Sequence, residues 1–228
     1  MQEFIAILVA IMMTFPSFYK DTETHQEREA RMTVIATSIA RASDHATCDG
    51  RWSNDKECEP VWTGSKKDLG LLLVTTAFWE SRMAQHIHEG NCTPGYRDKK
   101  GVYHRGECDE QVMKDIKGRV LKRWFRSRTI WQLQKHGDTA PEWDIMVGTS
   151  QKATDAAAWA AAKTLSRGYR SCGNHWGAIS KYAGVRHCKW EKGRKRVAFF
   201  ERLQGKYTDI EAKRVEAKDG GKKVASNP

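Results

Sequence analysis

The stretch LLLVTTAFWESRM, from Leu71 to Met83, constrains the fold more than any other part of the chain. It carries no charge for nine residues and then presents an acid, Glu80. A helix that is apolar nearly all round lies at the centre of a domain. Burying a charged side chain is costly unless it is paired, so a carboxyl at the end of such a helix tends toward its neutral, protonated form. The stretch therefore predicts a central helix that ends in a general acid.

Composition indicates one domain with tails. The chain has 228 residues, of which 39% are hydrophobic, enough for one sizeable core. We expect a hydrophobic N-terminal segment over 1–20, a catalytic domain over 21–210 and a basic flexible tail over 211–228. The net charge of +11 favours an anionic partner, such as nucleic acid, a membrane surface or an acidic wall polymer.

The N-terminal apolar run, Phe4 to Phe15, is twelve residues long. A membrane-spanning helix needs about 20. The run has the length of a secretory signal core but follows Glu3 instead of a basic residue. It is either an uncleaved, signal-like anchor or a segment packed on this domain or on a partner.

The six cysteines fall into three couples that are local in sequence, which predicts disulfides and an oxidising compartment. Six cysteines allow 15 connectivities, and short loops close most readily. A zinc site including His86, His88 and Cys92 is the alternative, although no C-x-x-C spacing occurs. The expected pairs are Cys48 with Cys58, Cys92 with Cys108, and Cys172 with Cys188.

The rest of the pattern is mostly helical. Tyr96 and Tyr103 flank the turn DKKG, which predicts a hairpin closed at its base by Cys92 and Cys108. Apolar periodicity and capping residues predict the helices. These span 23–41, 110–123, 151–167 (ended by Gly168), 176–182 and 194–203.

Three separated stretches, TTAFWESRM, SRTIWQLQ and GAISKYAG, resemble the lysozyme-like soluble lytic transglycosylases, a family that cleaves peptidoglycan. The resemblance implies a mainly α, α+β lysozyme-like fold with a small β-hairpin beside the active-site cleft. It implies no metal and no cofactor. Carried over by residue, Glu80 is the catalytic acid and base. The substrate-binding positions are Ser81 beside it, Gln132 as a cleft donor and Tyr182 as a hydroxyl near the acid.

Two positions depart from the family pattern. A family glycine is Thr129 here, and the late Tyr-Asn-Ala-Gly is shortened to Tyr182-Ala183-Gly184. A hydrolase often needs a second carboxylate. Asp98, in the hairpin turn, and Glu107, at its base, are the candidates, and Asp98 is better explained as a turn former. A single glutamate suffices for the family's reaction, which ends in an anhydro sugar.

We therefore expect an enzyme that cleaves peptidoglycan as a lytic transglycosylase or muramidase. It would act outside the cytosol, in the periplasm or cell wall or carried in a phage particle. Virion or envelope proteins are candidate partners for the N-terminal run. A structural or wall-binding module without turnover is one alternative. A nucleic-acid-binding protein is another, but the basic residues are scattered and no RRM, helix-turn-helix or zinc-finger pattern is evident.

Overall fold

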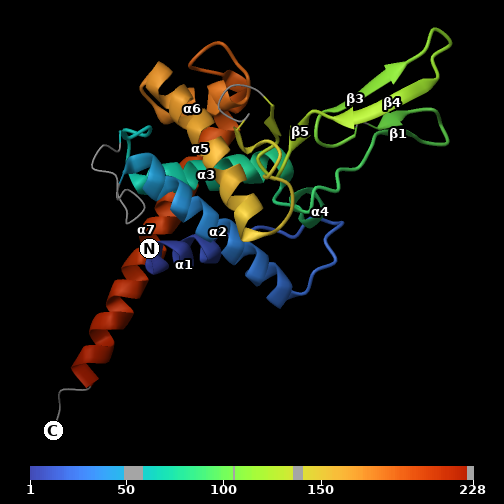
Figure 1. The fold of residues 1–228 in the computed structure, drawn as a ribbon. Helices are drawn as coiled ribbons and strands as arrows, with labels where there is room; N and C mark the ends of the chain where they lie inside the picture. Colours follow the sequence, from blue (N-terminus) through green and yellow to red (C-terminus); the bar gives the residue numbers. More distant parts are fainter. Residues whose placement is uncertain (49–58, 105, 136–140, 225–228) are drawn as a thin grey trace.

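The computed structural model describes residues 1–48, 59–104, 106–135 and 141–224. The protein is mainly helical, with three small two-stranded antiparallel sheets (Figure 1). The helices are α1 (Gln2–Met13), α2 (His25–Thr47), α3 (Lys66–Ser81), α4 (Gln85–His88), α5 (Gln151–Cys172), α6 (His175–Tyr182) and α7 (Arg194–Val224). The strands are β1 (Tyr96–Arg97), β2 (Tyr103–His104), β3 (Glu110–Lys114), β4 (Val120–Phe125), β5 (Ser127–Arg128) and β6 (Leu133–Gln134).

The central helix is α3, as the sequence predicts. It contacts α1, α2, α5, α6 and α7, which together with α3 we call the helical body. Its residues from Leu69 to Phe78 are all buried. The side chain of Ser65 caps its start by accepting a hydrogen bond from the N–H of Asp68. The helix ends where Arg82 turns left-handed, and this leaves Glu80 in the last turn.

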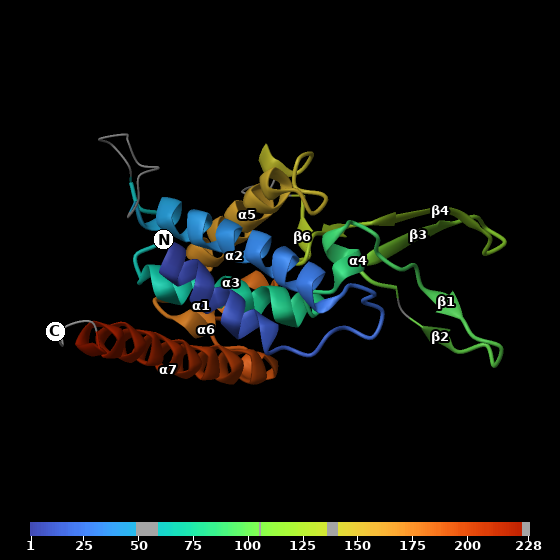
Figure 2. The same ribbon diagram turned by 90° about the horizontal axis from the view of Figure 1, so that it is seen from below.

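Helix α1 packs on the domain itself, one of the alternatives that the sequence left open. Ile7, Leu8, Ile11 and Met12 are fully buried in the same core as α3. The helix lies beside α2 and α7, as both views show (Figures 1 and 2). In the described residues, every helix is too short or too polar to cross a membrane.

Helix α5 runs past the end that the sequence predicted. Gly168 is inside the helix, and the left-handed residue that ends it is Gly173, with φ 71°. A Cβ on Gly168 would lie 3.0 Å from the Cα of Ala178. This glycine therefore permits close packing of α6 on α5 instead of stopping the helix.

The predicted hairpin is present, and a second one replaces a predicted helix. β1 pairs with β2 across the expected turn. Residues 110–123 do not form a helix: β3 and β4 pair as a longer hairpin. The physical reason is the turn at Asp115, whose carboxylate accepts hydrogen bonds from the N–H groups of Lys117 and Arg119, followed by Gly118 at φ 76°. We call residues 92–134 the hairpin region.

Helix α7 extends well beyond the predicted 194–203 and includes residues 211–224, which the sequence analysis assigned to a flexible tail. The segment is rich in Ala, Glu, Lys and Arg, which favour helix, and contains no proline before Val224. In Figure 1 its last turns project away from the body.

Two of the three predicted disulfides are confirmed. Cys92 is bonded to Cys108, and Cys172 to Cys188, with Cα atoms 6.0 and 5.5 Å apart. The predicted partner of Cys48 is Cys58, so that pair lies outside the described residues. Such bonds are typical of proteins that fold in an oxidising compartment.

Candidate functional site

A cleft of about 790 Å³ lies between the helical body and the base of the hairpin region. Glu80, Gln132 and Tyr182 all line it. These residues come from the end of α3, the segment before β6 and the end of α6, and they are far apart in sequence. The fold thus brings three of the four predicted site residues to one surface.

The Glu80 carboxylate is not the unpartnered acid that the sequence suggested. Its Oε1 accepts a hydrogen bond from Nη1 of Arg196, on α7. Both side chains are mostly shielded, at 21% and 18% exposure. The Arg196 guanidinium also lies over the rings of Trp79 and Trp190, at 5.9 and 5.6 Å from their centroids. An ion pair, and not desolvation alone, therefore accommodates the charge at the end of α3.

Tyr182 connects two of the three motifs. Its hydroxyl donates a 2.6 Å hydrogen bond to the carbonyl of Trp131. Burial raises the pKa of Tyr182 well above its usual value near 10, and the nearby negative charge of Glu80 raises it further. The tyrosine thus presents a neutral hydroxyl near the acid, and its hydrogen bond to the Trp131 carbonyl fixes its position.

Gln132 and Thr129 lie in a tight turn between β5 and β6. The Gln132 amide donates to the Thr129 carbonyl at 3.2 Å and to Sγ of Cys108 at 3.3 Å. Thr129 has φ 66°, a conformation that favours glycine. Here a buried threonine adopts this conformation.

Ser81 does not line the cleft. It is buried, its hydroxyl donates to the carbonyl of Ala77, and it accepts from the N–H of Met83. These bonds stabilise the end of α3 and so position Glu80. The role of Ser81 in substrate binding stays a prediction.

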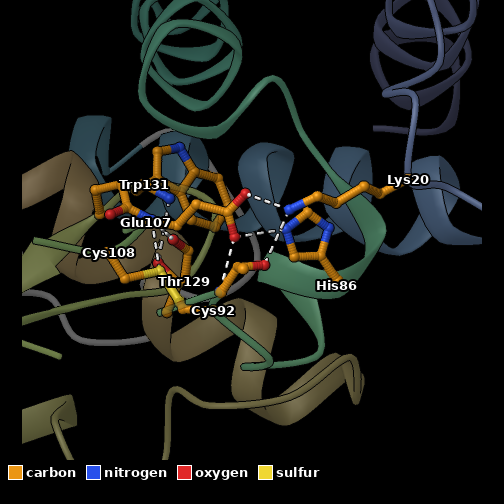
Figure 3. The surroundings of a disulfide bond; sticks show 9 residues. Lys20, His86, Cys92, Glu107, Cys108, Thr129 and Trp131 are labelled. Carbon is orange, nitrogen blue, oxygen red and sulfur yellow. Dashed lines mark hydrogen bonds and ion pairs between the residues drawn. A yellow bond between two sulfur atoms is a disulfide. The ribbon is translucent and has the colours of Figure 1, made fainter. Parts of the chain in front are cut away.

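Glu107 lines the cleft wall beside the disulfide between Cys92 and Cys108 (Figure 3). Its Oε2 accepts from the N–H of Thr93 and contacts Nε2 of His86, each at 2.8 Å, and its Oε1 lies 3.4 Å from Nζ of Lys20. Burial alone would raise the pKa of Glu107, but the bonds from Thr93 and His86 outweigh it and lower the pKa below its usual value. Glu107 is therefore a charged, oriented carboxylate.

Two further carboxylates have different places: Asp98 lies in a turn, and Asp109 lines the cleft. Asp98 accepts bonds from the N–H groups of Lys100 and Val102, and its Oδ2 lies 3.1 Å from Nε2 of His104. This is the predicted role in the turn. Asp109, which the sequence analysis did not single out, lines the cleft with Glu107. Its place directly after Cys108 was the available signal, since the disulfide fixes that part of the wall.

The residues of the zinc alternative are engaged elsewhere. Cys92 is in a disulfide, His86 faces Glu107, and Nε2 of the buried His88 lies 3.0 Å from the hydroxyl of Thr154. Among the described residues, no three His, Cys, Asp or Glu side chains are grouped as metal ligands.

No protein family model, no curated protein and no solved structure matches this chain. The cleft itself carries the functional information. It presents a paired glutamate, a neutral tyrosine hydroxyl, an amide and a second, charged carboxylate. That set can exchange a proton with a bound polyol and stabilise positive charge that develops on it.

Proposed function

We propose that the protein cleaves the glycan strands of peptidoglycan, with Glu80 as the catalytic acid and base in a lysozyme-like domain. One observation carries the proposal: the three stretches that resemble lytic transglycosylases contribute Glu80, Gln132 and Tyr182 to a single cleft. Nothing in their spacing along the chain requires this.

The proposed reaction needs only one acidic group. Glu80 gives its proton to the glycosidic oxygen as the bond to the anomeric carbon breaks. The muramic sugar's own C6 oxygen then bonds to that carbon, and its proton returns to the Glu80 carboxylate. The product is an anhydro sugar, and Glu80 is regenerated in its protonated form.

The charged carboxylate of Glu107 can stabilise the positive charge that forms on the sugar during this reaction. Glycosidic cleavage passes through an oxocarbenium-like transition state with positive charge on the sugar. A carboxylate held by Thr93 and His86 is preorganised to stabilise that charge. Asp109, on the same wall, is the second candidate for this role.

The ion pair with Arg196 sets a requirement on the acid step. Glu80 cannot donate a proton while its oxygen accepts from the guanidinium as a carboxylate, so the pair must open or be shared with substrate. Arg196 is held by the faces of Trp79 and Trp190, which provide it with a position independent of Glu80.

The test is a turbidity and zymogram assay on purified peptidoglycan, with Glu80→Gln beside the parent protein. We expect Glu80→Gln to fold normally and lose activity by at least about a hundredfold, since general acid catalysis contributes roughly 10²–10⁴. The matched control is Glu201→Gln, an exposed glutamate on α7, which should keep the parent rate. Equal activity of the two variants would contradict the proposal.

Mass spectrometry of the products then distinguishes the reaction types. We expect non-reducing anhydro-muropeptides, each one water lighter than a hydrolytic product. Reducing ends would instead indicate hydrolysis, and Glu107→Gln and Asp109→Asn would identify the second carboxylate.

A second candidate function is a wall-binding module without turnover, which the Glu80–Arg196 pair favours because it occupies the acid. This candidate predicts that the parent protein sediments with purified peptidoglycan but releases no muropeptides. It also predicts that Glu80→Gln binds as the parent does.

A further inference from the structure

The β3–β4 hairpin projects away from the helical body, as the two views show (Figures 1 and 2). Its outer part, residues 113–122, comprises the ends of both strands and the turn between them. We call these ten residues the arm tip. They lie outside the cleft of the proposed reaction.

The arm tip exposes aliphatic side chains. Ile116, at the turn, is fully exposed, and Leu121 is 60% exposed. Met113 and Val120 are also exposed. Several exposed aliphatic side chains gathered in one short projecting segment mark a surface that binds something apolar.

Basic residues are interspersed with these aliphatic residues along the arm tip. The arm tip contains four basic residues and one acid, a formal charge of +3. The acid, Asp115, is paired with Arg119 at 2.6 Å. Within the described part of the chain, the ammonium groups of Lys114, Lys117 and Lys122 have no carboxylate partner. Three positive charges without a carboxylate partner among the described residues therefore accompany the aliphatic groups.

The turn satisfies several of its own backbone donors. The N–H groups of Lys117 and Arg119 donate to the Asp115 carboxylate, and that of Gly118 donates to the Asp115 carbonyl. A backbone donor that leaves water without a partner costs several kcal/mol, so these hydrogen bonds lower the cost of moving the turn toward an apolar phase. The fully exposed Ile116 side chain lies in this turn.

We infer that the arm tip binds the surface of a bilayer that contains anionic phospholipids. The aliphatic side chains would enter the boundary between headgroups and acyl chains, and the lysines would face the phosphates. Glycan strands and nucleic acids also attract lysine, but they present sugar hydroxyls, rings and phosphates and offer no apolar phase to Ile116, Leu121 and Met113. The attachment is peripheral and independent of cleavage in the cleft.

The experiment is co-sedimentation of the full chain with vesicles of phosphatidylcholine alone or mixed with phosphatidylglycerol. We expect binding to the mixed vesicles, weaker binding in high salt and little binding to phosphatidylcholine alone. Lys117→Gln with Lys122→Gln should weaken binding by about fivefold for each lysine. Ile116→Ser with Leu121→Ser should weaken it by roughly tenfold or more, since both lose their contact with the apolar phase.

Matched controls lie elsewhere on the surface. Ile145→Ser removes an exposed isoleucine outside the arm, and Lys213→Gln removes an exposed lysine of α7. Both should bind vesicles as the parent does. Glu80→Gln should also bind fully, which separates this inference from the proposed cleavage.

Two outcomes would overturn the inference. One is vesicle binding that neither arm pair weakens. The other is the absence of vesicle binding while purified peptidoglycan or DNA retains the parent and loses the arm variants, which would assign the arm to a polymer.

Discussion

The helical body and the hairpin region are held together by different means. In the body, α3 is surrounded by five helices and a continuous core. The end of the hairpin region joins that core through Ile130, Trp131 and Leu133. Among the described residues, its outer part, β1 to β4, packs on a small cluster of Ala84, Ile87 and Cys108 and is tied by a disulfide and by hydrogen bonds to the charged Glu107. The cleft lies where the two regions meet. A rigid body thus carries the acid, while the wall facing it is set by local bonds.

The largest expected effect is the loss of stability when a buried leucine of the body, and not an exposed leucine of the arm tip, is replaced by alanine. Leu72→Ala, at a fully buried position of α3, should lower the free energy of unfolding by about 2–5 kcal/mol. Leu121→Ala, on the arm tip, should change it by less than about 0.5 kcal/mol. Urea denaturation measures both, and similar losses would mean that the arm is packed in solution.

The two disulfides allow the two regions to be compared directly, because each joins cysteines that are 16 residues apart in sequence. Loop entropy alone predicts about 3 kcal/mol for each. Replacing Cys172 and Cys188 by serine should lower the melting temperature of the whole domain. Replacing Cys92 and Cys108 should chiefly speed amide hydrogen exchange in β1 to β4. Equal effects of both changes on both measurements would show that the two regions unfold as one unit.

The buried His88, in α4, predicts how the stability of the protein depends on pH. Desolvation, and then the charge of Arg31, lowers the pKa of His88 to about 3 from its usual 6.5. Below pH 6.5 the unfolded chain takes up this proton and the folded protein does not, so stability falls with decreasing pH until about pH 3. The slope from this group approaches 1.4 kcal/mol per pH unit.

Denaturation at several pH values tests this dependence. His88→Gln should flatten the fall in stability between pH 6.5 and 4, and His25→Gln, at an exposed position of α2, should not. An unchanged slope in His88→Gln would assign the acid sensitivity to other groups.

The smallest effect concerns two left-handed residues, one in each region. Thr129→Gly should relieve strain but lose the bond that Thr129 Oγ1 accepts from the N–H of Trp131, so stability should change by less than about 1 kcal/mol. Gly173→Ala has the same backbone conformation at the end of α5 and no such bond to lose. It should cost about 1 kcal/mol. If Thr129→Gly lowers the free energy of unfolding by more than about 1 kcal/mol, the hydrogen bond to the threonine hydroxyl contributes more stability than the relief of backbone strain restores.

Local patterns predicted the parts of this fold that depend on neighbouring residues. The apolar run of α3, the turn at Asp98 and the short α6 are each recognisable within about a dozen residues, and the structure contains them. Residues 110–123 were wrongly predicted as a helix, because their mixed composition gave no clear period and the turn at Asp115 was overlooked. The length of α7 was underestimated for a similar reason: its polar second half has no apolar stripe to extend the pattern.

The sequence by itself determined the buried central helix, the acid in its last turn and two disulfide pairs, because apolar periodicity and short loops act over small distances along the chain. Only the tertiary structure decided that α1 belongs to the core, that Arg196 faces Glu80 across 116 residues, and that Glu107 and Asp109 share the cleft wall. These contacts depend on how helices and hairpins pack in three dimensions. An ion pair between α7 and α3 leaves no local signal in the sequence, because the two charges are adjacent only after the core has packed.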